Sequence, residues 1–203
     1  MLDLRNLPRK LDSLEVGGDT NYADFTTDGV LTFYGDARVK RHLILDPKRF
    51  QMPAANYPGE SFEGLYYTMN FDKGTEESAY CQEHVPYRWD SSTDIEIVVS
   101  WFHDGVDAGV VVWGAEYKSI TAGEAVTGAG TTITQASTGT HTAGVEVRTA
   151  FTTKILHGNL AQDDDFVMRF YRDADAVADT LNEDARLLNV HITFTQNALG
   201  EAI

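Results

Sequence analysis

Six histidines are the side chains of this sequence that could bind a metal ion or transfer a proton. A histidine metal site on a β-sandwich would place two of them two residues apart on one strand, near a glutamate, with a third on a later strand. No two histidines here are separated by two, three or four residues, so we predict no metal site and no cofactor. The histidines are His42, His84, His103, His141, His157 and His191.

Two groups of aspartates supply closely spaced oxygen ligands of the kind that calcium prefers. They are residues 163–165 and the set Asp173, Asp175 and Asp179. Neither group is followed by the glycine and the glutamate that a calcium-binding loop requires at its sixth and twelfth positions. We therefore interpret both groups as solvated loop residues.

Paired carboxylates can cleave a glycosidic bond, and Glu96 and Glu116 are the candidates on well-defined strands. Both alternate with apolar residues and are therefore predicted to face outward. The sequence has no Gly-x-Ser-x-Gly elbow, no phosphate-binding loop and no setting that would activate Cys81. We expect a protein that is not an enzyme, and keep a hydrolase built on the same fold as a minor alternative.

The elements that would position these side chains are strands with strict apolar/polar alternation, clearest in residues 188–195. A period of two predicts a strand with one buried and one solvated face. The pattern recurs at the spacing of a sandwich, with connections rich in Gly, Asp, Ser and Thr. We predict strands at residues 62–72, 79–89 (an edge candidate, broken by Pro86), 94–102, 109–120, 131–137, 145–155, 166–171 and 188–195.

About eight such strands predict an all-β fold, an antiparallel jelly-roll sandwich, with a sandwich of another topology as the alternative. Residues 1–33 show little periodicity and are predicted to form an extended N-terminal arm, followed by the sandwich domain over residues 34–203. Residues 173–186 fit either two turns of helix or a long ordered loop.

The net charge of −15 is distributed unevenly. Residues 1–50 hold eight basic and eight acidic side chains, whereas residues 51–203 hold eight basic and 23 acidic ones. An acidic body repels phosphate backbones, so we predict no nucleic-acid partner. The acidic charge fits either a surface that keeps the protein in solution or a body that must not bind DNA or membranes, with a neutral arm that docks. A single cysteine, no signal-peptide pattern and no membrane-length apolar run indicate a protein made in a cytoplasm, with no membrane partner.

Aromatic residues are the remaining candidates for contacts. Trp101 and Trp113 alternate inward and are predicted to pack in the core. Tyr66 and Tyr171 fall on predicted outward faces, where aromatic rings hold sugars or fill subunit interfaces. His191 lies on the polar face of its strand and is predicted to be a surface or interface residue.

Several stretches together resemble a group of small jelly-roll virion proteins of tailed bacteriophages and related prophages. Tyr34-Gly35-Asp36-Ala37-Arg38-Val39 precedes a proline-rich loop, and the β-rich body that follows contains residues 94–101, 111–117, 166–172, 179–181 and 188–195. The resemblance covers residues 34–197.

The resemblance implies a non-enzymatic virion protein, made in the host cytoplasm, that acts as a homotrimeric decoration or cement protein on the capsid. Its N-terminal region would contact the major capsid protein or a sister subunit. Alternatives are a tail or baseplate component and a carbohydrate-binding module that recognises host-surface glycans. The candidate contact residues are Tyr34, Asp36, Arg38, Lys40, Arg41, Lys48 and Arg49, with Tyr66 and Tyr171 as exposed aromatic contacts.

Overall fold

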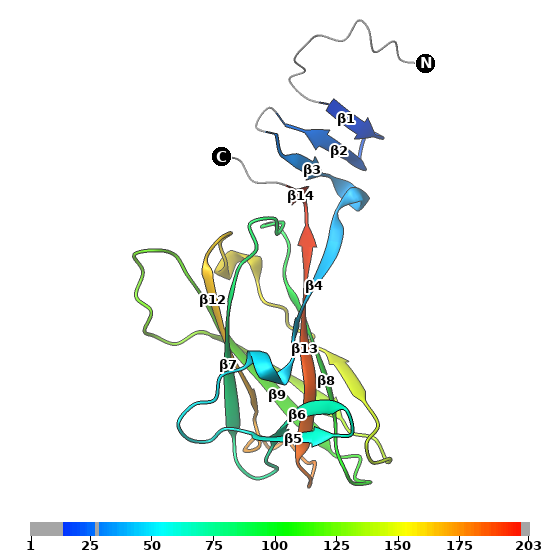
Figure 1. Ribbon diagram of the computed structural model, residues 1–203, viewed down its shortest axis with the longest axis vertical. Coiled ribbons are helices and arrows are strands. Elements are labelled where there is room, and N and C mark those ends of the chain that lie inside the picture. The colour runs from blue at the N-terminus through cyan, green and yellow to red at the C-terminus, as the bar shows by residue number, and fades with distance from the viewer. Residues whose placement is uncertain (1–13, 27–28, 200–203) are drawn as a thin grey trace, which may run out of the picture.

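The computed structural model describes residues 14–26 and 29–199. Within them, fourteen strands form three sheets, and every pair of strands is antiparallel. Two of the sheets face each other as a β-sandwich, which confirms the predicted fold class (Figure 1). No helix in the described ranges has the length and apolar character needed to cross a bilayer.

The first sandwich sheet has the order β10-β9-β12-β7. Its strands are β7 (Glu77–His84), β9 (Val110–Ile120), β10 (Thr131–Thr138) and β12 (Asp165–Arg172). β7 is an edge strand and ends before Pro86, as predicted for residues 79–89.

The second sandwich sheet has the order β11-β8-β13-β6-β5, and β4 pairs with the second half of β13. Its strands are β4 (Val39–Leu45), β5 (Gly59–Glu63), β6 (Tyr66–Phe71), β8 (Glu96–Phe102), β11 (Val147–Ala150) and β13 (Ala185–Gln196). The strand predicted at residues 62–72 is confirmed for residues 66–71, which form β6, whereas residues 62 and 63 belong to β5. Gly64, at φ +60°, turns the chain between β5 and β6 and leaves Leu65 99% exposed.

A third, smaller sheet has the order β1-β2-β3-β14 and stands clear of the sandwich (Figure 1). It consists of β1 (Leu14–Gly17), β2 (Tyr22–Phe25), β3 (Leu31–Phe33) and β14 (Ala198–Leu199), and we call it the arm sheet. β4 and the second half of β13 connect it to the sandwich, and we call this ribbon the stalk. The described part of the predicted arm is thus folded into strands; residues 1–13 lie outside the described residues.

The core lies between the two sandwich sheets and is centred on aromatic rings. Trp113 of β9 stacks on Phe170 of β12 with centroids 5.3 Å apart, and it meets Trp101 of β8 and Phe71 of β6 edge-on. Both predicted inward tryptophans are fully buried. Residues 173–184 form an ordered loop and not two turns of helix, which were the other alternative for residues 173–186.

Candidate functional site

The stalk and the turns at its two ends carry the residues predicted to contact a capsid. Tyr34 stacks on Tyr22 of β2 with centroids 4.4 Å apart. The Asp36 backbone N–H donates to Asn21 Oδ1 over 2.9 Å, and Asn21 Nδ2 donates to Asp36 Oδ2 over 3.1 Å. These two predicted contact residues therefore hold the 3-10 turn η2 (Gly35–Ala37) against the arm sheet.

Arg38 ties the start of the stalk to the sandwich. Its Nη1 lies 2.6 Å from Oδ2 of Asp90, whose side chain is buried. Burial raises the pKa of Asp90, but hydrogen bonds from Ser92 and Arg38, and the charge of Arg38, outweigh that effect and hold the pKa below its ordinary value. Asp90 is thus kept ionised as the anchor of Arg38.

The next two cations run along the stalk and are also engaged within the chain. Lys40 Nζ lies 3.2 Å from Glu96 Oε1, which Lys154 also contacts at 2.9 Å. Arg41 Nε donates to Gln196 Oε1 over 2.9 Å, across the β4–β13 pair. Hydrogen bonds from Lys154 and Lys40 lower the pKa of Glu96 despite its partial burial.

The last two predicted cations lie in the 3-10 turn η3 (Pro47–Arg49), where the stalk enters the sandwich. Lys48 Nζ lies over the Tyr67 ring, 3.5 Å from its centroid, and Arg49 forms a 2.7 Å ion pair with Glu83. The charged groups of the predicted contact residues thus make contacts within the chain that hold the stalk on the sandwich.

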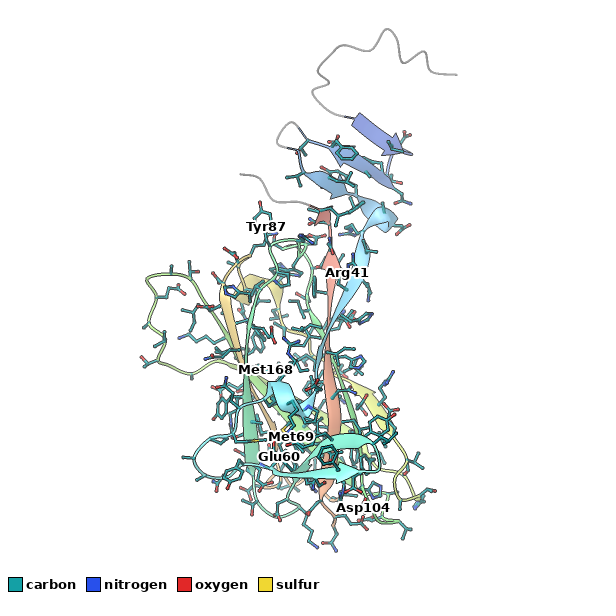
Figure 2. All side chains as sticks on the ribbon, viewed as in Figure 1. Arg41, Glu60, Met69, Tyr87, Asp104 and Met168 are labelled. Atoms are coloured by element: carbon teal, nitrogen blue, oxygen red, sulfur yellow. The ribbon has the colours of Figure 1, made fainter. Side chains whose placement is uncertain are left out.

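A notch of about 410 Å³ lies where the stalk meets the sandwich. Arg41 lines it from the stalk and Tyr87 from the loop after β7, near each other in Figure 2. No acidic side chain lines this notch, and Arg88 has no ion pair within the described residues. The notch is a positive, partly aromatic hollow on an acidic protein, suited to an acidic segment. It is lined by Arg41, His42, Pro86, Tyr87, Arg88, Phe194 and Gln196.

A second hollow, of about 420 Å³, lies on the six-stranded sheet. A register shift between Leu187 and Asn189 puts a bulge in β13, and Leu188 and Asn189 line the hollow there. Asn189 Oδ1 is buried without a hydrogen-bond partner in the described part of the chain. Asp104, which also lines it, lies at the opposite end of the sandwich from Arg41 and Tyr87 (Figure 2).

Tyr66 lines this second hollow and is exposed, as predicted. An exposed ring beside Arg148, Glu146 and the Asn189 amide combines a stacking platform with donors and acceptors for hydroxyl groups. This set could bind a sugar. Sequence reasoning found Tyr66 but missed Asn189, because a bulge leaves no signal in an alternating pattern.

The prediction that Tyr171 is an exposed aromatic contact is wrong. It faces outward from its sheet but is buried, because Gly114 on the neighbouring strand leaves room for its ring. The Arg169 guanidinium covers the ring from 4.3 Å. Tyr171 therefore packs against neighbouring residues on the outer face of its own sheet and does not form an exposed contact surface.

The residues considered for catalysis are not assembled into one site. Glu96 on β8 and Glu116 on β9 belong to different sheets, and each contacts basic side chains of its own sheet face. No group of three or more His, Cys, Asp or Glu side chains in the described ranges is arranged to hold a metal ion.

Two of the histidines have defined roles in packing. His103 is fully buried; its Nε2 accepts from the Thr140 backbone N–H, and its Nδ1 lies 3.1 Å from Glu183. His191 is half-buried, with its ring 6.5 Å from that of His42 on the stalk. Burial, Arg148 and His42 together lower the pKa of His191.

No protein-family model matches the chain, and no curated protein sequence matches it. Solved structures with similar folds include dimeric latent PorU from Porphyromonas gingivalis, at 11% identity and a TM-score of 0.42, over 79% of this chain and 13% of that one. Another is the CBM36-1 domain of a multidomain xylanase from the hindgut metagenome of Trinervitermes trinervoides, at 10% identity and a TM-score of 0.41, over 80% of this chain and 100% of that one.

A third similar structure is that of the infectious bursal disease virus Gt strain, at 14% identity and a TM-score of 0.33. It is matched over 91% of this chain and 40% of that one. The chain thus spans 13% of the PorU chain and 40% of the viral chain. Similarities this distant carry no inference about function.

Proposed function

We propose that this chain is a non-enzymatic structural protein of a tailed-bacteriophage virion. It decorates the capsid as a homotrimeric cement protein and docks on the major capsid protein through its N-terminal region. The sandwich faces outward, and the stalk end faces the shell.

The observation that carries this proposal is the arm sheet, held clear of the sandwich on the stalk (Figure 1). Five internal contacts fix the direction of the stalk, and they are made by cations of the stalk and of the turns at its two ends, from Arg38 to Arg49. The charge division supports the same arrangement, because residues 1–50 are neutral while the rest of the chain carries the whole net charge of −15. A projection of this kind reaches a neighbour without enlarging the core.

Particle binding tests the proposal. The full chain should cosediment with capsids of the phage that encodes it, and a variant lacking residues 1–33 should stay in the supernatant. Residues 16–26 and 29–33, the part of this segment whose burial the structure describes, contribute no core residue, so the sandwich of the truncated protein should still fold. Undiminished binding of the folded truncated protein would refute docking through this region.

A charge reversal in the notch, Arg88→Glu, tests whether the notch beside the stalk takes part in docking. It should weaken binding more than Lys73→Glu, which makes the same charge change at the other end of the sandwich. Equal effects of both reversals would show that the notch has no special part in docking.

A second candidate function is glycan recognition at the host surface, as a tail or baseplate component or a carbohydrate-binding module. The hollow around Tyr66 favours it, because it joins an exposed ring to Asn189 Oδ1, which has no hydrogen-bond partner among the described residues, at the end remote from the arm sheet. A glycan array probed with the full chain tests this function. Tyr66→Ala should abolish any binding found, whereas Tyr57→Ala, which removes an exposed ring elsewhere, should leave it intact.

A further inference from the structure

One face of the arm sheet is apolar throughout. The register places Val16, Ala23 and Phe33 side by side across β1, β2 and β3. Phe25, Leu31 and Leu199 form the next row across β2, β3 and β14. Paired residues of antiparallel strands share a face, as do residues two apart along one strand, so these six side chains form one surface. We call it the apolar arm face.

The opposite face of the same sheet is polar. Asp24 pairs with Thr32 at its centre, and Tyr22 of β2 stacks with Tyr34 beside them. An amphipathic sheet of this kind normally packs its apolar side on another layer. Within the described residues no such layer is present: Val16 is 62% exposed, Phe25 is 48% exposed, and no described side chain of residues 16–26 and 29–34 is buried.

We propose that the apolar arm face is the surface through which copies of this chain bind one another. All six of its side chains are hydrocarbon, so the face has no charge or hydrogen-bonding group to orient an unlike partner. An identical apolar face on a second copy can pack against it, because contact between two hydrocarbon surfaces needs no charged or hydrogen-bonding group. The proposal deepens the proposed homotrimer by naming its interface.

The charge distribution favours the same occupant. Residues 51–203 carry the net charge of −15, so the sandwiches of two copies repel each other. The apolar arm face holds no charged side chain, and Asp24 lies on the opposite face of the arm sheet, so copies can approach through the apolar arm face without bringing like charges on it together. The stalk keeps the arm sheets in contact while the acidic sandwiches remain apart (Figure 1).

Sedimentation equilibrium of the full chain tests the inference. Wild-type protein should have a mass that is a multiple of the chain mass, and Phe25→Lys, on the apolar arm face, should reduce it to that of a single chain. Thr32→Lys is the matched control, because it places the same charge on the opposite face of the sheet, next to Asp24. Its mass should equal that of the wild type. Near-UV circular dichroism of Trp101 and Trp113 in the sandwich core reports folding in each variant.

Thiol labelling gives a second readout that does not depend on a disruptive charge. In Val16→Cys the new thiol should react with a maleimide at least tenfold more slowly than that of Val126→Cys, which lies in an exposed loop. Equal rates would mean that the apolar arm face is open in solution and would overturn the inference.

The remaining outcomes separate this inference from the proposed function. A wild-type monomer overturns both the interface and the homotrimer. A wild-type dimer that Phe25→Lys dissociates supports the interface and overturns the trimer. A Phe25→Lys protein that keeps its oligomeric mass but no longer binds capsids overturns the interface, because the face would then contact the capsid protein.

Discussion

Arg172 and Asp179 form a two-point ion pair that is withdrawn from solvent. The guanidinium Nε and Nη2 lie 3.0 and 2.7 Å from the two carboxylate oxygens, and the two side chains are 0% and 2% exposed. The other donors of Arg172 reach the carbonyl oxygens of Leu181 and Glu183 over 2.7 and 2.8 Å. Asp179 also accepts the Val112 backbone N–H of β9. One arginine thus ties the loop of residues 173–184 to the end of the sandwich.

Arg172→Met should lower the free energy of unfolding by about 3–5 kcal/mol, because it leaves the buried Asp179 carboxylate without its partner. Urea unfolding followed by tryptophan fluorescence measures the change. The control is Lys40→Met, which breaks an exposed ion pair with Glu96 and should cost less than about 1 kcal/mol. Equal losses in the two variants would contradict a structural role for the buried pair.

The two core tryptophans should differ in their response to phenylalanine. Trp101 Nε1 donates to Ser137 Oγ over 2.7 Å and so links β8 to β10 across the sandwich, whereas Trp113 Nε1 is buried with no partner in the described residues. Both substitutions remove a similar volume, but only Trp101→Phe also removes a hydrogen bond. We expect Trp101→Phe to cost about 1–2 kcal/mol more in the same urea experiment. The reverse order would contradict this assignment.

Long strands in which apolar and polar residues alternate could be predicted from sequence, because one face of such a strand lies against the core and the other faces outward. β9 and the part of β13 after its bulge follow this rule on their inward faces: Val111, Trp113, Val190 and Ile192 are all buried as predicted. The arm sheet could not be predicted in the same way. Its strands have two to four residues, too few for a period of two to stand out.

The candidate contact surfaces depend on partners that are distant in sequence. Arg38 and Asp90 are 52 positions apart and Lys40 and Glu96 are 56 apart, so the composition of residues 34–49 showed cations but not their pairing. Tyr171 was misplaced for a related reason: its burial depends on the absent side chain of Gly114 on another strand. Alternation reports which face a side chain lies on, and packing on that face decides whether it is exposed.

The link between Arg38 and Asp90 should make the stalk's attachment depend on pH. The pKa of Asp90 is lower in the folded protein than its ordinary value of 3.8. The carboxylate therefore contributes its full stabilisation above that value, and the contribution is lost as the pH falls through the lower pKa of the folded state. Asp90→Asn should cost more stability at pH 7 than at pH 3, measured by urea unfolding at both. In an Arg38→Met background the difference between the two pH values should shrink, and an unchanged difference would argue against the pair.

The thiol of Cys81 should be inert in the folded protein and reactive in the unfolded one. Burial, with the nearby charge of Glu83, raises its pKa to about 12, and the side chain is 1% exposed. At pH 8 the buried thiol therefore stays protonated and lacks the reactive thiolate form. Ellman's reagent should detect no thiol in native protein and one per chain in guanidinium chloride, while Val126→Cys should show one fast-reacting thiol before denaturation. One reactive thiol in the native wild-type protein would place Cys81 at an accessible surface. Cys81 would then react with the maleimide as well, and the labelling of Val16→Cys on the apolar arm face could not be measured separately.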